Sequence, residues 1–148
     1  MSESRNKMID AIRHVVVPTL RDMGFRGSYP HFKRIRDSQI DLLMFQFNRY
    51  GGSFVVEVAF CDPAGWTHAN GRYIPAKEVQ VGDISPRQRL RLGSCPPKQA
   101  DHWFSFEPES SSIYTDTALE ALSLIRSQGE DFWRTHKPAI LTDPSWPR

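Results

Sequence analysis

Two cysteines and two histidines are the side chains best suited to chemistry, and they are spaced alike. Cys61 lies seven residues before His68, and Cys95 lies seven residues before His102. Thiolates and imidazoles bind zinc, so this spacing suggests a Cys₂His₂ metal site. Zinc ligands usually come in closer pairs, roughly two to four residues apart, because a short turn then fixes both donors. We therefore favour a buried Cys61 beside loop histidines, with no metal and no cofactor, and keep zinc as the alternative.

A cysteine beside a histidine would also suit nucleophilic catalysis. The pairs on offer are Cys61 with His68 or His102, but a reactive thiol needs an electropositive, exposed setting that no sequence pattern here indicates. The sequence contains no serine-centred elbow, phosphate-binding loop or HExxH pattern. We therefore assign no catalytic residue. The alternative is a small-ligand binder or enzyme whose pocket, between a helix and the sheet, includes Gln46, Cys61 and His102.

A third group combines arginines with aromatic residues, a composition typical of protein interfaces and of surfaces that bind single-stranded nucleic acid. Its members are Arg49, Tyr50, Trp66, Arg89, Arg91 and Trp103. The first two stand at an expected hairpin tip, and the arginines at 89 and 91 alternate along an expected strand. We predict that this group contacts a protein partner. The alternative interpretation of alternating arginines is the solvated face of a sheet.

The composition is that of one globular domain. The chain has 148 residues, 39% of them hydrophobic, and a net charge of +2. We expect a single domain over residues 1–148, with a core from about 4 to 136 and an extended tail over 137–148. No run of about 18 apolar residues occurs, and the start MSESRNKM lacks the apolar core of a signal peptide. These features predict a cytoplasmic protein with no membrane partner.

Charge is distributed unevenly but is small in total. Lys and Arg minus Asp and Glu gives 9 − 5 = +4 for residues 1–50, 6 − 4 = +2 for 51–100 and 4 − 8 = −4 for 101–148. A dipolar surface steers partners without identifying them. The total is too small for strong phosphate contacts, so we expect no nucleic-acid partner. The sequence leaves the oligomeric state open.

An apolar ribbon from Gln39 to Phe60 should hold these candidates in place. Its two alternating runs, joined at Gly51-Gly52, predict a hairpin at the centre of a sheet. Further strands are expected over 31–36, 87–92 and 102–106. Residues 61–84 are rich in Pro, Gly and Asp and predict a long excursion with at most one short strand.

Two helices complete the predicted fold. The first runs from about Ser4 to Met23 and ends at Gly24. Pro18 should either kink it near Val17 or divide it into two short helices. The second begins near Thr117, where Thr117-x-x-Glu120 fits a capping box. Leu119, Leu122 and Ile125 should form its buried face, with a break at Gly129 and a stop at Pro138.

The predicted fold class is α+β: an antiparallel sheet of about five strands with both helices packed on one face. The other face, or the 61–84 excursion, would then be free for a partner.

Several motifs resemble a bacterial family catalogued as domain of unknown function 4304. The best match is the pattern FQ-x-x-x-YG-x-SF at Phe45–Phe54. The pair GF at 24–25 and the sequence R-x-RLG at 89–93, followed by D-x-W at 101–103, also match. The resemblance spans roughly Met8 to Phe132. Asn48, Cys95 and Phe104 depart from the residues that are commoner in the family.

The resemblance also implies a kind of partner. Some members of such small bacterial families lie beside polymorphic toxins and resemble immunity proteins, which cover the active site of a toxin. It therefore implies a non-enzymatic binding module whose partner is a toxin. The positive net charge disfavours a nuclease toxin, whose inhibitors tend to be acidic, and favours a toxin with an acidic cleft.

Overall fold

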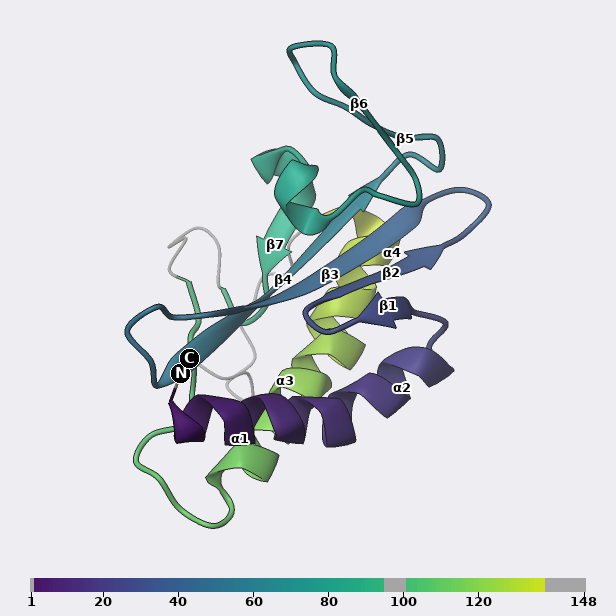
Figure 1. Cartoon of the computed structure of the whole chain (residues 1–148). Coiled ribbons are helices and arrows are strands. Elements are labelled where there is room, and N and C mark those ends of the chain that lie inside the picture. The colour runs from purple at the N-terminus through teal and green to yellow at the C-terminus, as the bar shows by residue number, and fades with distance from the viewer. Residues whose placement is uncertain (1, 95–100, 138–148) are drawn as a thin grey trace.

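The predicted apolar ribbon forms the centre of the sheet (Figure 1). The computed structural model describes residues 2–94 and 101–137. Strands β3 (Ile40–Phe47) and β4 (Ser53–Cys61) pair antiparallel along their length, from Ile40 opposite Cys61 to Phe47 opposite Phe54. Gly51 and Gly52 connect them with φ values of 93° and 80°, a conformation that favours glycine.

Short antiparallel strands extend this ribbon on both sides. The order is β1-β2-β3-β4-β7, and β8 pairs with the start of β4. Their bounds are β1 Arg26–Ser28, β2 His31–Ile35, β7 Arg89–Arg91 and β8 Phe104–Ser105. The α+β class and the antiparallel sheet are thus confirmed. No strand was predicted over residues 26–28, but they pair with β2; three residues are too few to show alternation.

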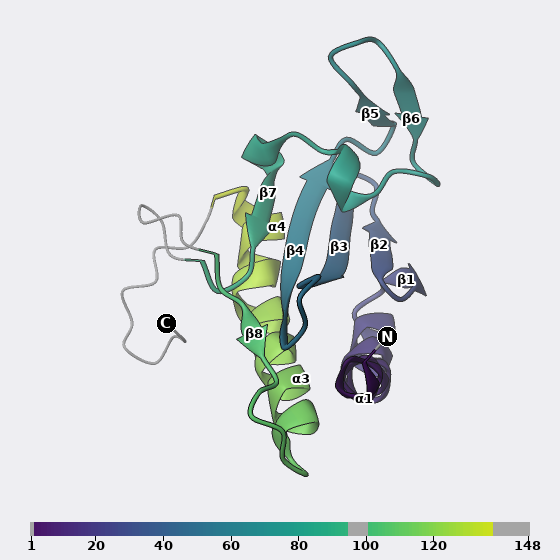
Figure 2. The same cartoon turned by 60° about the vertical axis from the view of Figure 1, so that its left-hand side comes forward.

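Both helical segments pack on the same face of the sheet, as predicted (Figures 1 and 2). The amino-terminal segment comprises α1 (Glu3–Ala11) and α2 (Val17–Asp22), joined by a π-helical turn over Ile12–Val16. The amide of Val17 donates to the carbonyl of Ile12, five residues back. Such a wide turn accommodates Pro18, which has no amide to donate, so a π turn stands before Val17, where we expected a kink or a division into two helices.

Local hydrogen bonds fix both ends of the amino-terminal segment. The Ser2 hydroxyl accepts from the amide of Arg5 at 3.1 Å and so caps α1. Gly24, with φ 99°, follows α2, and the amide of Phe25 donates back to the carbonyl of Leu20 at 2.9 Å. This arrangement satisfies the last carbonyls of the helix, so the predicted end at Gly24 is confirmed.

The second helical segment starts earlier than predicted. Helix α3 spans Ile113–Leu124, and the Ser110 hydroxyl accepts from the Ile113 amide at 3.1 Å. Thr117 is buried in the second turn and donates to the Ser105 carbonyl at 3.1 Å, so it caps nothing. Leu119, expected to be buried, is 50% exposed. Placing the start at Thr117 misassigned these positions, whereas Ile125 is buried as expected.

Gly129 does not break this segment. A π-helical turn over Ile125–Gly129 leads directly into α4 (Glu130–Thr135). The helix ends at His136, which has a φ of 63°. The π turn includes Gly129 as its last residue, and the helix continues beyond it. Pro138, the predicted stop, and the tail beyond it lie outside the described residues.

Two apolar clusters lie on opposite faces of the sheet. The larger lies between sheet and helices and includes Phe45, Phe54, Ile125 and Trp133. The smaller lies on the other face, where Ile74, Val79, Val81 and Ile84 of the 61–84 excursion cover Ile40, Leu42, Ala59 and Cys61. The face that we expected to be free is therefore covered at this end.

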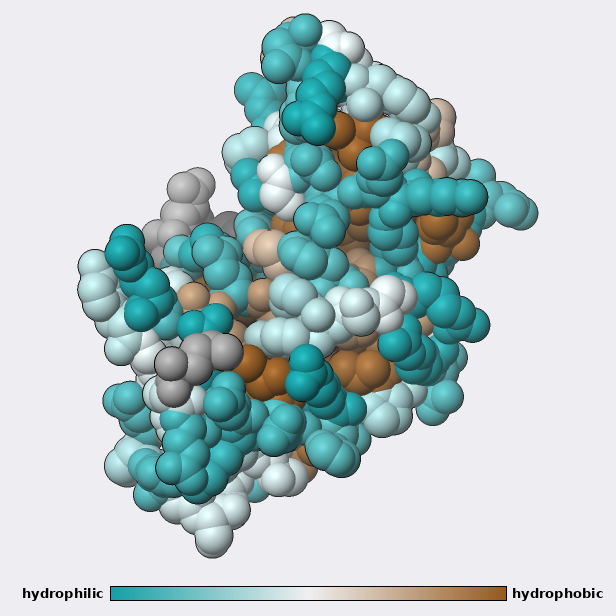
Figure 3. Space-filling model, in the orientation of Figure 1, coloured by the Kyte–Doolittle hydropathy of each residue, from teal (hydrophilic) through white to brown (hydrophobic). Residues whose placement is uncertain are grey.

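The excursion also contains more regular structure than predicted. Strands β5 (Gly65–Thr67) and β6 (Tyr73–Pro75) pair into an arm that rises from the sheet (Figure 1). Each strand has only three residues, which left no alternation to detect in the sequence. Hydrophilic residues cover most of the face shown in Figure 3, with apolar residues in patches between them.

Candidate functional site

The two alternating arginines of β7 lie beside a buried carboxylate of β4. Arg91 pairs opposite Glu57, and Arg89 pairs opposite Ala59, so the three charged side chains share the face away from the helices. Arg89 Nη1 and Arg91 Nε each lie 3.9 Å from a carboxylate oxygen of Glu57. Because Glu57 is only 8% exposed, these guanidinium groups compensate a charge that would be costly alone.

Two residues that precede β8 complete this cluster. The Arg91 guanidinium lies 6.0 Å from the ring centre of Trp103, and its Nη1 is 2.8 Å from Asp101 Oδ2. Trp103 keeps 39% of its surface exposed, so one part of the ring faces Arg91 and another remains open. We call Glu57, Arg89, Arg91, Asp101 and Trp103 the arginine–tryptophan site.

One donor of the arginine–tryptophan site is unpaired. The Nε atom of Arg89 is buried and makes no hydrogen bond with any residue that the structure describes. A hollow of about 370 Å³ adjoins it, lined by the charged side chains of the site together with Pro86 and Ser94. A buried donor without an acceptor costs free energy, so an acceptor oxygen from a partner would stabilise this position.

The other predicted contact residues lie apart from this site. Arg49 and Tyr50 stack at the β3–β4 hairpin tip, 5.4 Å from guanidinium carbon to ring centre, and Tyr50 is 87% exposed. The tip adjoins β8, because the amide of Phe106 donates to the carbonyl of Gly52. Trp66 belongs to the β5–β6 arm, beyond the opposite end of β4. The structure thus gathers Arg89, Arg91 and Trp103 but not the whole predicted group.

The residues of the predicted pocket do not converge. Gln46 is exposed and pairs with Val55, whereas Cys61 pairs with Ile40 at the other end of the ribbon. Six residues of strand separate the two levels, roughly 20 Å. His102 lies elsewhere, with its Nε2 3.1 Å from Glu120 Oε1 and its ring edge-on to Phe104.

Cys61 lies in an environment that suppresses thiolate formation. It is 3% exposed at the end of β4, and burial is the main cause that raises its pKa from 9.0 to about 11. Asp62 and Asp41 act in the same direction, and Lys33 acts against them. A thiol that stays protonated at neutral pH is a weak nucleophile, so the environment of Cys61 fits a core residue.

This buried thiol should make stability depend on alkaline pH. Between pH 9.0 and about 11 the unfolded chain loses the Cys61 proton while the folded chain keeps it. We expect this difference to lower the free energy of unfolding by roughly 2 kcal/mol across the window, and to leave it unaffected below. The check is urea unfolding of the unaltered protein and of Cys61→Ala at several pH values. Parallel pH profiles for the two proteins would contradict the prediction.

The histidines of the metal hypothesis pair with carboxylates in two separate places. His68 Nε2 lies 3.6 Å from Asp83 Oδ1, and His102 contacts Glu120 as described. Within residues 2–94 and 101–137, no group of three or more His, Cys, Asp or Glu side chains has an arrangement that would hold a metal ion. Cys95, the fourth residue of the hypothesis, lies outside the described residues.

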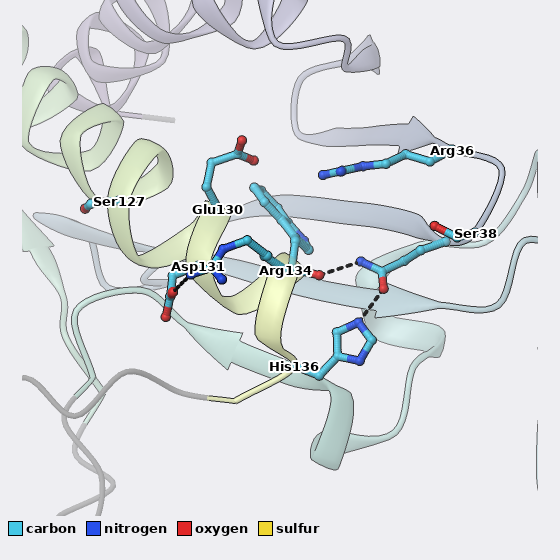
Figure 4. Close-up of a pocket in the computed structure, with 9 residues that line it drawn as sticks. Arg36, Ser38, Ser127, Glu130, Asp131, Arg134 and His136 are labelled. Atoms are coloured by element: carbon cyan, nitrogen blue, oxygen red, sulfur yellow. Dashed lines mark hydrogen bonds and ion pairs between the residues drawn. The ribbon is translucent and has the colours of Figure 1, made fainter.

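A pocket that sequence reasoning missed lies between α4 and the β2–β3 turn (Figure 4). Its volume is about 780 Å³, and its lining includes Arg36, Gln39, Glu130, Arg134 and His136. The side-chain amide of Gln39 donates to the Trp133 carbonyl at 2.9 Å, while its oxygen contacts Nε2 of His136. This pairing makes His136 Nε2 the donor, because the Gln39 amide nitrogen is already donating.

The charged groups of this pocket are already paired. Arg36 binds Asp41, Arg134 binds Asp131 at 2.6 Å, and Glu130 binds Arg34 at 2.6 Å. The arrangement therefore holds α4 against the β2–β3 turn rather than presenting groups for reaction. One sequence signal for these pairs is Asp41, a carboxylate within the apolar ribbon, which is buried and accepts from Arg34 and Arg36.

An antiparallel sheet with both helical segments on one face defines an α+β domain. The chain belongs to the family described as Domain of unknown function (DUF4304), whose family model matches residues 16–134. The match contains β1 to β8 and all of α3, and so confirms the resemblance seen in the motifs. Searches of curated proteins and of solved structures gave no match. Among the described residues, no helix is both long enough and apolar enough to cross a bilayer.

Proposed function

We propose that this domain is a non-enzymatic protein-binding module and that the arginine–tryptophan site is its contact surface. The observation that carries the proposal is the buried Nε of Arg89, which has no hydrogen bond among the described residues, in the same site as the partly exposed Trp103 that lies beside Arg91. Arginine and tryptophan are enriched among residues that dominate binding energy at interfaces. The alternative of a ligand pocket built on Gln46, Cys61 and His102 lacks the convergence of groups that it requires.

The charges of the site indicate what the partner presents. Arg91 already has a partner at 2.8 Å in Asp101, whereas the one charged contact of Arg89, to Glu57, is 3.9 Å long. A carboxylate of the partner would supply the missing acceptor to Arg89, and an apolar group beside it would cover the open part of Trp103. The partner surface is thus acidic with an apolar neighbour. More specifically, we propose that this partner is a toxin with an acidic cleft.

The arginines can be tested with a matched change in the same cluster. We expect Arg89→Ala/Arg91→Ala to weaken partner binding by tenfold or more, since one interface arginine often contributes about 2 kcal/mol. Glu57→Gln removes a carboxylate that competes with the partner, so it should leave binding unchanged or tighten it. The partner is captured with the tagged protein from its native cells, and the affinities are then measured by calorimetry.

Two controls separate binding from folding. The exposed Arg126 lies on another element, the π-helical turn that follows α3, so Arg126→Ala should bind normally. Thermal unfolding of each variant shows whether the fold persists. A partner that binds the double variant and the unaltered protein equally well would refute the proposal, and so would failure to capture any protein. Growth rescue on co-expression with the captured partner tests the toxin form separately.

A further inference from the structure

A second hollow lies at the opposite edge of the sheet from the arginine–tryptophan site. It has a volume of about 730 Å³ and lies between the β1–β2 hairpin and residues 77–83 of the excursion. Volumes of roughly 300–1,000 Å³ are typical of pockets that bind small molecules. We call it the His31–Lys33 pocket, after the two β2 residues that line it.

Lys33 is anchored within this pocket by backbone oxygens. Its Nζ donates to the carbonyl of Ala76 at 3.0 Å and to that of Lys77 at 2.7 Å. Burial is the main cause that lowers its pKa from 10.5, against the influence of Cys61, Asp83 and Glu78. Two of the three ammonium donors are thus engaged with carbonyls, which fixes the position of the charge and leaves one donor for a ligand.

His31 contributes a polar atom without a partner. Its Nδ1 is buried and makes no hydrogen bond within residues 2–94 and 101–137. Burial, followed by the nearby charge of Lys33, lowers the pKa of the imidazole from 6.5, so the ring is mainly neutral at pH 7. A buried ring nitrogen without a partner is costly, and a hydrogen bond from a ligand would recover part of that cost.

The lining charges limit the charge of a ligand. Lys33, Arg72 and Lys77 are cationic and Glu78 and Asp83 are anionic, which gives 3 − 2 = +1. Asp83 is partly engaged, because its Oδ2 accepts from the amide of Gln80 at 2.9 Å. One carboxylate would neutralise this lining, whereas a phosphate dianion would leave an excess negative charge.

We propose that the His31–Lys33 pocket binds a small organic acid with one carboxylate and a second polar group. The carboxylate pairs with the Lys33 ammonium, and the second group forms a hydrogen bond with Nδ1 of His31. The inference is independent of the partner-binding proposal, because the two sites lie at opposite edges of the sheet and share no residue.

Three probes test the charge requirement by NMR titration of the ¹⁵N-labelled full chain. Salicylate carries one carboxylate and a hydroxyl, 2-hydroxybenzyl alcohol replaces the carboxylate with a neutral group, and phenyl phosphate is dianionic. We expect salicylate to shift the His31 ring nitrogens saturably and to bind at least tenfold more tightly than either other probe. Absence of a saturable shift, or equal or tighter binding of the alcohol or the phosphate, would overturn the proposal.

Two substitutions locate the binding. Lys33→Gln removes the charge while keeping an N–H donor for the carbonyls of Ala76 and Lys77, and His31→Phe removes the unpaired nitrogen. Both should weaken salicylate binding tenfold or more, whereas Arg49→Gln at the remote hairpin tip should not. Unchanged affinity in either folded variant would contradict the assignment. If Lys33→Gln does not fold, the His31→Phe result decides.

Discussion

Replacing Asp41 with alanine is expected to lower the free energy of unfolding by about 3–5 kcal/mol, because it leaves the largely buried guanidinium of Arg34 without its buried counter-charge. Asp41 is 0% exposed within β3. Its Oδ2 accepts from Arg34 Nε at 2.8 Å and from Arg36 Nε at 2.7 Å, and its Oδ1 accepts from the Gln39 amide at 2.6 Å. Four atoms of the protein are thus arranged around one carboxylate, counting the second Arg36 contact.

The position of Arg34 explains why the loss should be large. Its guanidinium lies 4.6 Å from the ring centre of Phe25 and 5.2 Å from that of Trp133. It also donates to the carbonyl of Met23 at 3.2 Å and to Glu130 at 2.6 Å. Arg34 therefore connects the end of α2, the sheet and α4 at one point. Without Asp41, this side chain keeps its charge in an apolar setting with only a partly exposed carboxylate to offset it.

Urea unfolding of Asp41→Ala tests this expectation, with Glu130→Gln as the matched control. Glu130 binds the same arginine but is 40% exposed, so water replaces its interaction and the loss should stay within about 1 kcal/mol. Equal losses in the two variants would show that burial of the carboxylate does not determine the effect. A loss below about 1 kcal/mol for Asp41→Ala would contradict the stabilising role that we assign to the pairing of Asp41 with Arg34.

Features with a local signal were predictable from sequence. Alternation over residues 40–47 and 53–61, with two glycines between them, is enough to specify a hairpin. Gly24 and Pro18 act through their own backbones, so the end of α2 and the distortion before it also followed. The predicted start of α3 was wrong because Ser110 and Thr117 are both plausible caps. Only the hydrogen bond from Thr117 to Ser105 distinguishes them.

The sites depend on contacts between distant segments, which sequence spacing does not encode. Alternation placed Arg89 and Arg91 on one side of a strand, but the pairing of β7 with β4 brings them to Glu57. The sequence allowed Gln46 and Cys61 to share a pocket, but the strand register places them at opposite ends of the ribbon. The His31–Lys33 pocket requires residues 77–83 to fold back over β2, and no local pattern reports that.

The 61–84 excursion and the ion pairs of Asp41 lie on opposite faces of β3 and β4. Residues 74–84 cover one end of β3 and β4 on the face away from the helices. Asp41, beside Ile40 and Leu42 in sequence, points to the helical face and binds Arg34 there. This end of the sheet is thus fixed from both sides, whereas the β7–β8 side presents the arginine–tryptophan site.

Replacing Trp133 with alanine is the second change expected to have a large effect, a loss of about 3–5 kcal/mol in the free energy of unfolding. Trp133 is 2% exposed in α4, and its ring centre lies 5.1 Å from that of Phe25. Its indole Nε1 donates to the carbonyl of Ala59 in β4 at 2.9 Å. The side chain therefore combines a large buried surface with the hydrogen bond that joins α4 to the sheet.

Trp133→Phe separates these two contributions, because it keeps most of the ring volume and removes the indole donor. We expect a smaller loss, about 1–3 kcal/mol, since the Ala59 carbonyl loses its indole donor while the contact with Phe25 largely persists. Leu119→Ala, at a half-exposed position of α3, should cost less than about 1 kcal/mol. Urea unfolding of the three variants ranks their losses in the free energy of unfolding. If Trp133→Phe cost as much as Trp133→Ala, the hydrogen bond rather than the packing would hold α4 against β4.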